Sequence, residues 1–227
     1  MDKKILIFDA SPIITLTMTG LLEEFKRLRD SSNVQFIITK EVHSEIVERP
    51  SQIKRFELEA IKAKDLISKG YLEFPEKVGV SDRAISELTK DVLNLSNKAF
   101  KANGKDIHLI DLGEASCLAL SKILRDKGIE NVTVIDERTT RMLCEAPEKL
   151  GDLLQKKLHS KITWDKKYFD DFDKIKIIRS AELMYLAYKK DLLRLKGKEV
   201  LEAVLYAVQF KGCSIPEEEI KEIVRKG

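Results

Sequence analysis

The chain begins with a short apolar run that ends at a carboxylate, Lys3-Lys4-Ile5-Leu6-Ile7-Phe8-Asp9-Ala10-Ser11-Pro12. Four consecutive large apolar residues are typical of a strand buried on both faces of a parallel sheet. Asp9 then lies at the carboxyl end of this strand, where ligands bind in open α/β sheets. A buried charge at that place needs a partner, and a bound metal ion is one such partner.

Short apolar runs and amphipathic stretches alternate along the rest of the chain. Further strands are predicted over residues 34–38, 71–74, 132–136 and 175–179. Helices are predicted over residues 12–28, 39–47, 51–69, 81–102, 111–124 and 180–192, with a turn at 103–105. This alternation predicts an α/β fold of three α/β/α layers around a central parallel sheet, with further helices at the C-terminus.

Two parts of the chain depart from this rhythm. Residues 146–175 contain Pro147, a lysine-rich helix and a loop rich in aspartate, and we interpret them as an insertion. Residues 196–227 hold two helical patterns separated by 212–216, and they form a C-terminal helical extension of the domain over 1–195.

Composition indicates an intracellular protein. Of the 227 residues, 35% are charged, above the roughly 25% of ordinary soluble domains, but the net charge of +3 is too small to indicate a nucleic-acid partner by itself. The three cysteines are far apart and form neither a zinc motif nor a disulfide framework. No apolar run approaches the roughly 20 residues that span a bilayer. We therefore expect a soluble, cytoplasmic protein with reduced thiols and no membrane partner.

Four acidic residues occupy corresponding places in this pattern. Asp9 and Asp136 each end a buried strand, while Glu45 and Glu114 each lie on a helix that follows a strand or a turn. Glu41, one turn before Glu45, is an alternative inward residue. Oxygen ligands in this number suit Mg²⁺ or Mn²⁺, which can activate water for cleavage of a phosphodiester. No serine, cysteine or lysine nucleophile paired with a base is apparent.

Four motifs in this order resemble those of PIN-domain proteins. They are Asp-Ala-Ser-Pro-Ile-Ile (9–14), Thr-Lys-Glu-Val-His-Ser-Glu-Ile (39–46), Asp-Leu-Gly-Glu-Ala-Ser-Cys-Leu-Ala-Leu (111–120) and Val-Ile-Asp-Glu-Arg-Thr-Thr-Arg (134–141). The chain is most similar to the VapC-like subgroup with a Gly-Glu-Ala motif, of an archaeal type with a C-terminal extension. The segment 177–183 also resembles the last strand and helix of that subgroup.

The resemblance implies a metal-dependent ribonuclease, as in toxin–antitoxin systems or RNA processing. Its metal-holding and catalytic acids would be Asp9, Glu45, Glu114 and Asp136, with Mg²⁺ or Mn²⁺ as the cofactor. Asp111, which stands in an N-cap position, would be an accessory metal ligand. The implied partners are RNA, an antitoxin protein and a second copy of the chain in a homodimer.

Other residues have more than one reading. Ser11 would orient Asp9 or contact the metal-bound water. Arg138 and Arg141 would hold phosphates or simply face solvent, and Thr139 and Thr140 would shape the site. The aromatic residues Trp164, Tyr168 and Phe169, with nearby lysines, would stack on single-stranded RNA. Interleaved aspartates make a packed lid or a dimer contact the preferred interpretation of that segment.

Two alternatives to a ribonuclease remain. One is a PIN-fold module that binds RNA or supports assembly without cutting. The other is a phosphatase or phosphoacceptor domain on a doubly wound sheet. A haloacid-dehalogenase-type phosphatase would need a second aspartate two residues after Asp9, where Ser11 stands, and a phosphoacceptor domain would need an acidic pair and a late lysine that are not evident.

Overall fold

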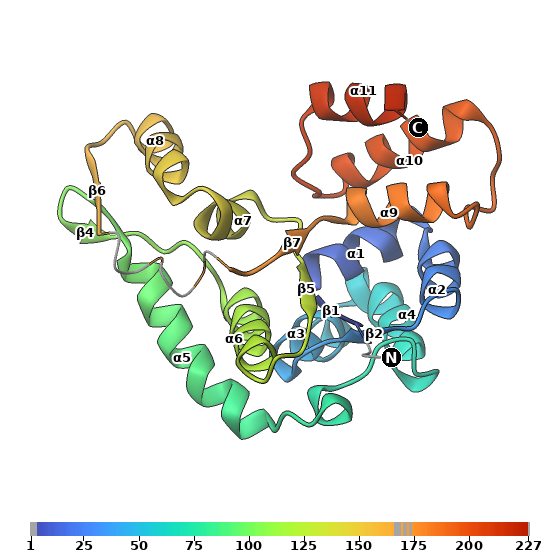
Figure 1. The fold of residues 1–227 in the computed structure, drawn as a ribbon, viewed down its shortest axis with the longest axis horizontal. Helices are drawn as coiled ribbons and strands as arrows, with labels where there is room; N and C mark the ends of the chain where they lie inside the picture. The colour runs from blue at the N-terminus through green and yellow to red at the C-terminus, as the bar shows by residue number, and fades with distance from the viewer. Residues whose placement is uncertain (1–3, 166–168, 170–171, 173, 227) are drawn as a thin grey trace.

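A parallel sheet of four short strands forms the centre of the molecule (Figure 1). The computed structural model describes residues 4–165, 169, 172 and 174–226. From edge to edge the strand order is β2 (Val34–Ile37), β1 (Lys4–Phe8), β5 (Asn131–Val134) and β7 (Ile177–Ile178). A single parallel bridge between Ile37 and Glu73 adds a further backbone segment beside β2. β1 is therefore a central strand, as its unbroken apolar run predicts.

Helices flank both faces of this sheet and complete the predicted α/β fold. On one side, α1 (Ala10–Thr19), α2 (Leu22–Asp30) and α9 (Ser180–Lys189) contact one another. On the other side, α6 (Leu112–Asp126) contacts β1 and β5, and α5 (Asp82–Lys98) lies along α6. The last residue of β1 contacts helices on both sides: the Phe8 ring lies 5.3 Å from the Phe25 ring of α2, and the Phe8 carbonyl accepts from the Cys117 thiol of α6.

The C-terminal helices are part of the same core. α10 (Lys198–Phe210) packs on α9 and α1, and α11 (Glu217–Lys226) packs on α10. Leu201 and Leu205 of α10 are buried in the core that also holds the β1 side chains. The predicted extension is thus helical, and it closes one side of the domain.

A second, antiparallel sheet that the sequence analysis did not predict lies at one end of the molecule (Figure 1). Its strand order is β4 (Lys105–Asp106), β3 (Phe100–Ala102) and β6 (Ile162–Trp164), and it packs against α8 (Pro147–Leu158). Asn103 and Gly104 join β3 to β4 with φ angles of 50° and 80°, the left-handed pair that tight hairpins require. We call β3, β4, α8 and β6, residues 100–106 and 147–164, the arm.

The arm contains most of the predicted insertion. Phe169 is buried and contacts the Phe100 ring at 5.5 Å, and Trp164 packs so closely on α8 that a Cβ at Gly151 would lie 2.8 Å from its ring. These contacts agree with the packed interpretation of the aromatic residues. Tyr168 lies outside the described residues.

Several predicted element boundaries are wrong, and each error has a local cause. The predicted helix 12–28 is two helices, because Gly20 ends α1 in the left-handed conformation with φ 75°. The predicted helix 51–69 starts only at Glu57 as α4 (Glu57–Ser68), because Ile53 is extended between two 3-10 turns. The predicted helix 81–102 ends at Lys98, because residues 100–102 pair with β6. In the described part of the chain, no helix is long and apolar enough to cross a membrane.

Candidate functional site

Asp9 is a buried carboxylate at the junction of β1 and α1. It occupies the N-cap position of α1, and its Oδ2 accepts hydrogen bonds from the Ser11 hydroxyl at 2.7 Å and the Ser11 N–H at 3.2 Å. Burial raises the pKa of Asp9, and the negative charge of Asp136 adds to this rise. The N-cap contacts therefore only partly offset the loss of hydration, and Asp9 has the environment of a group that a cation would stabilise.

Ser11 connects the ends of β1 and β5. Its hydroxyl donates to Asp9 and accepts from the backbone N–H of Asp136 at 3.4 Å. The Asp9 N–H in turn donates to the carbonyl of Val134 in β5 at 3.0 Å. Ser11 therefore lies where it orients Asp9, the contact that the sequence analysis expects.

Glu45 reaches the site from the turn after β2. The short helix α3 (Lys40–His43) is capped by Thr39, whose hydroxyl accepts from the Val42 N–H at 3.2 Å, and it continues into a π-helical turn, η1 (Ser44–Glu48). The Glu45 carboxylate meets the first turn of α6, where a Cβ at Gly113 would lie 2.7 Å from its Oε2. A glycine at 113 is what allows this approach. Burial raises the pKa of Glu45, and the negative charge of Asp9 raises it further.

Glu114 projects from the first turn of α6. Its Oε2 accepts from the Asp111 N–H at 3.0 Å, and its Oε1 accepts from the Thr140 hydroxyl at 2.5 Å. Burial, and then the negative charge of Asp9, raise the pKa of Glu114 to about 7. At neutral pH this carboxyl is thus only partly ionised in the metal-free chain.

Three of the predicted acids converge on one place between β1 and α6. Cys117 lies on α6 one turn after Glu114, and its thiol donates to the Phe8 carbonyl. Burial raises the pKa of the Cys117 thiol, and the charges of Asp9, Glu45 and Glu114 raise it further. Asp9, Glu45 and Glu114 span 105 positions of the sequence, yet the charge of Asp9 raises the pKa values of both glutamates.

Asp111 stays at the edge of this group. It holds the predicted N-cap position of α6, but its side chain is 80% exposed and lies 2.8 Å from Nε2 of His108. Its carboxylate thus faces solvent beside the cluster.

Asp136 is held away from solvent. Its side chain has no exposed surface, Oδ1 accepts from the Ser180 N–H at 2.7 Å, and both carboxylate oxygens accept from the Ser180 hydroxyl at 2.9 and 2.8 Å. Burial raises the pKa of Asp136. The Ser214 N–H, from the loop between α10 and α11, donates to the Asp136 carbonyl at 3.1 Å. The C-terminal helices therefore cover this acid, an arrangement that the sequence analysis missed.

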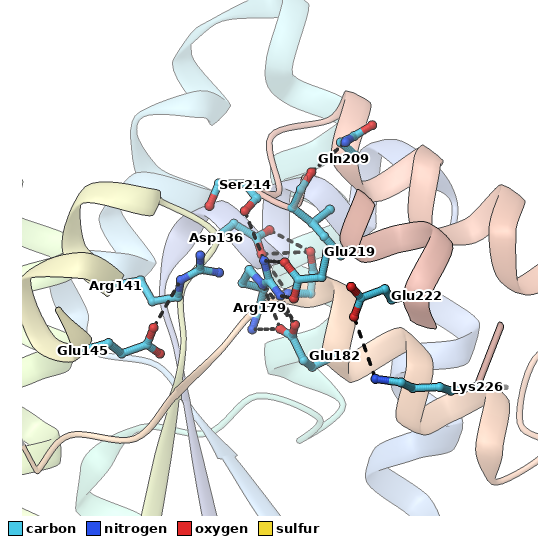
Figure 2. Close-up of polar contacts among 12 residues, drawn as sticks. Asp136, Arg141, Glu145, Arg179, Glu182, Gln209, Ser214, Glu219, Glu222 and Lys226 are labelled. Atoms are coloured by element: carbon cyan, nitrogen blue, oxygen red, sulfur yellow. Dashed lines mark hydrogen bonds and ion pairs between the residues drawn. The ribbon is translucent and has the colours of Figure 1, made fainter. Parts of the chain in front are cut away.

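A buried arginine holds that loop in place. Figure 2 shows the Arg179 side chain between Glu182 of α9 and Glu219 of α11. Its Nε lies 3.0 Å from Glu182 and its Nη1 lies 3.0 Å from Glu219, while Nη1 also donates to the Ser214 carbonyl at 3.2 Å. We call Arg179, Glu182, Ser214 and Glu219 the Arg179 cluster. It joins α11 to α9 directly beside Asp136.

The helix after Asp136 brings one of the two threonines predicted to shape the site, Thr140, to a predicted acid. In α7 (Arg138–Glu145), Arg138 is exposed, and the Thr139 hydroxyl donates to Glu137 at 2.9 Å. Thr140 is the residue that reaches Glu114. The signal for this was present in the sequence, because Thr140 shares the inward face of α7 with Leu143 and Cys144, and all three are buried.

The donor set has the chemistry of a hard-cation site. Asp9, Glu45 and Glu114 offer carboxylate oxygens, the ligands that Mg²⁺ and Mn²⁺ prefer. Burial first, and neighbouring negative charges second, raise the pKa values of all three, and a bound cation would offset both effects. Within the described residues, no three His, Cys, Asp or Glu side chains already form a group that could hold an ion. Glu114 and Asp136 are instead engaged by protein hydroxyl and N–H donors.

The raised pKa of Glu114 predicts how stability depends on pH. The pKa of the Glu114 carboxyl is about 7 in the folded chain and 4.5 in the unfolded chain. Between these values the folded chain binds more protons than the unfolded chain, so the free energy of unfolding should fall as pH rises through this interval. The contribution of Glu114 to this fall is about 3 kcal/mol. Glu114→Gln should remove that part of the fall in urea denaturation with EDTA between pH 4.5 and 8. Glu87→Gln, on the exposed face of α5, is the control, and equal slopes for the two variants would contradict the prediction.

Comparison with known proteins adds no assignment. No family model, curated protein or solved structure matches this chain.

Proposed function

We propose that this chain is a Mg²⁺- or Mn²⁺-dependent endoribonuclease that hydrolyses phosphodiester bonds with water as the nucleophile. The observation that carries the proposal is the placement of Glu45 against the first turn of α6, where Glu114 also lies, beside the end of β1 that Asp9 follows. The resemblance of their surrounding motifs to PIN-domain proteins supports RNA as the substrate. A role in toxin–antitoxin systems or in RNA processing is the biological setting that this resemblance favours.

The proposed acids have different tasks. Asp9, oriented by Ser11, would hold the cation together with Glu45 from η1 and Glu114 from α6. Asp136 contributes negative charge behind Asp9, and Asp111 is an accessory group at the rim. A bound divalent ion supplies an activated water molecule and stabilises the charge that develops on the phosphate. No side chain of the protein needs to act as the attacking nucleophile.

The test is cleavage of a labelled, mixed-sequence single-stranded RNA in Mg²⁺, in Mn²⁺ and in EDTA. We expect internal cuts only with the metals. Attack by water leaves no 2′,3′-cyclic phosphate, whereas attack by the neighbouring 2′-hydroxyl does, so analysis of the product ends separates this activity from that of a contaminating metal-independent ribonuclease. Cleavage that persists in EDTA, or cyclic phosphate ends, would argue against the proposal.

The second candidate is a module that binds RNA or supports assembly without cutting it. The observation in its favour is the fully buried Asp136, whose carboxylate is already satisfied by Ser180. RNA binding that survives EDTA, with no cleavage in either metal, is the result that would favour this candidate over the nuclease.

A further inference from the structure

The arm has a net positive charge, whereas the rest of the chain is neutral. It contains six lysines and three acidic residues, so its net charge of +3 equals that of the whole protein. The remaining chain has 35 basic and 35 acidic residues. The modest net charge of the protein is therefore concentrated in 25 residues.

Four of these lysines gather at the outer end of the arm. Lys105 follows the β3–β4 turn, Lys156 and Lys157 lie in the last turn of α8, and Lys161 precedes β6; all four are exposed. The hairpin turn and the loop after α8 are joined, because the Asn103 N–H donates to the Lys161 carbonyl at 3.5 Å and the Asn103 amide donates to the Ser160 hydroxyl at 3.4 Å. We call Lys105, Lys156, Lys157 and Lys161 the lysine end.

The acids of the arm lie elsewhere. Asp106 pairs with Lys101 at 2.9 Å. Glu148 and Asp152 lie in the first half of α8. The positive potential of the lysine end is therefore not balanced by acids within its own turn and loop.

Two of the four chain segments that connect the arm to the domain lead to the candidate site. β4 ends five residues before Asp111, and Glu114 follows in the first turn of α6. α8 packs on α7, which begins two residues after Asp136. The 12 residues of α8 span about 18 Å, and the lysine end lies at the end of this helix that is farther from α7.

A second basic segment serves as a comparison. Residues 189–198 contain five basic residues, but Arg194 pairs with Glu24 and Lys196 pairs with Asp191. This segment starts at the far end of α9 from Ser180 and Asp136, and Figure 1 shows α9 and the arm on opposite sides of the molecule. Of the two basic surfaces, only the arm adjoins the acids.

We propose that the lysine end binds the phosphate backbone of single-stranded RNA and holds the strand beside the acids. Exposed lysines act as point charges for phosphates and do not read sequence. A positively charged surface of this kind can follow the backbone of a single strand without sequence preference. The choice of RNA as the ligand rests on the proposed function.

The test is binding of a fluorescein-labelled 20-nucleotide single-stranded RNA, measured by fluorescence anisotropy in EDTA across 50–200 mM KCl. The full chain is compared with the variant Lys105→Gln, Lys156→Gln, Lys157→Gln, Lys161→Gln. Loss of four phosphate contacts should weaken binding roughly ten- to a hundredfold and lower the slope of log affinity against log salt by about 3. Because the four side chains are exposed, the melting temperature should not change.

The matched control removes the same charge from other exposed lysines, by Lys64→Gln, Lys69→Gln, Lys189→Gln and Lys190→Gln. Its affinity should stay within about threefold of the unaltered chain. Equal weakening in both variants, or no binding by the unaltered chain, would overturn the inference. Cleavage in metal without arm-dependent binding would leave the proposed function standing, whereas arm-dependent binding without cleavage would overturn the function and leave the inference.

Discussion

Asp9→Asn should cleave RNA at least about a hundredfold more slowly than the unaltered chain in Mg²⁺ or Mn²⁺. Asparagine keeps the shape of the side chain and can still accept from Ser11, but it removes the charge at the centre of the candidate site. A metal ion contributes several kcal/mol to stabilisation of a phosphoryl transition state. Each 1.36 kcal/mol of lost transition-state stabilisation slows a reaction tenfold. A hundredfold loss therefore corresponds to about 2.7 kcal/mol, roughly half of what the metal ion contributes.

The same variant separates a catalytic from a structural role for Asp9. Because burial raises the pKa of Asp9, removing its charge should leave the melting temperature in EDTA equal or higher. The matched control is Asp126→Asn, an exposed aspartate at the opposite end of α6 that lies 3.7 Å from Lys122, and it should cleave like the unaltered chain. Full metal-dependent cleavage by Asp9→Asn would refute the assigned site.

Arg179→Met should lower the free energy of unfolding by roughly 2–4 kcal/mol. The Arg179 side chain is 5% exposed and faces two carboxylates and a carbonyl. Methionine fills part of the space but leaves Glu182 and Glu219 facing each other without a cation. Breaking a buried ion pair costs roughly 3–5 kcal/mol, and the 34% and 39% exposure of the two glutamates lowers that figure. For a chain of this size the melting temperature should fall by roughly 5–10 °C.

A double-mutant cycle tests whether Arg179→Met lowers the free energy of unfolding because it removes the contact with Glu219 of α11. Glu219→Gln alone should destabilise the protein, and its effect should shrink in the Arg179→Met background, because the partner is already absent. Arg83→Met breaks an exposed pair with Glu87 on α5 and should change stability by less than about 1 kcal/mol. Strict additivity of the Arg179 and Glu219 effects would show that the Arg179 cluster does not join α11 to α9.

Local patterns in the sequence account for the fold class and for the three acids that meet. The unbroken run 5–8 is typical of a strand buried on both faces, and a carboxylate that follows such a strand lies at the edge of the sheet. Glu114 is close to Asp9 because α6 must pack its small, apolar face on β1. Local patterns also located the Asn103-Gly104 turn. They failed at Gly20 and at residues 100–102, where a glycine conformation and a distant strand ended the helical periodicity.

The sequence by itself determined the parallel sheet, the flanking helices and the placement of Asp9 and Glu114 at one edge, because these follow from periods of two and 3.6 residues and from strand ends. Only the tertiary structure decided that Thr140 donates to Glu114, that Ser180 and the loop at Ser214 enclose Asp136, and that Gly113 admits Glu45. These partners lie 26 to 78 residues apart, and no local period relates them. Their contacts arise from the way that packed helices bring separate turns to the same sheet edge.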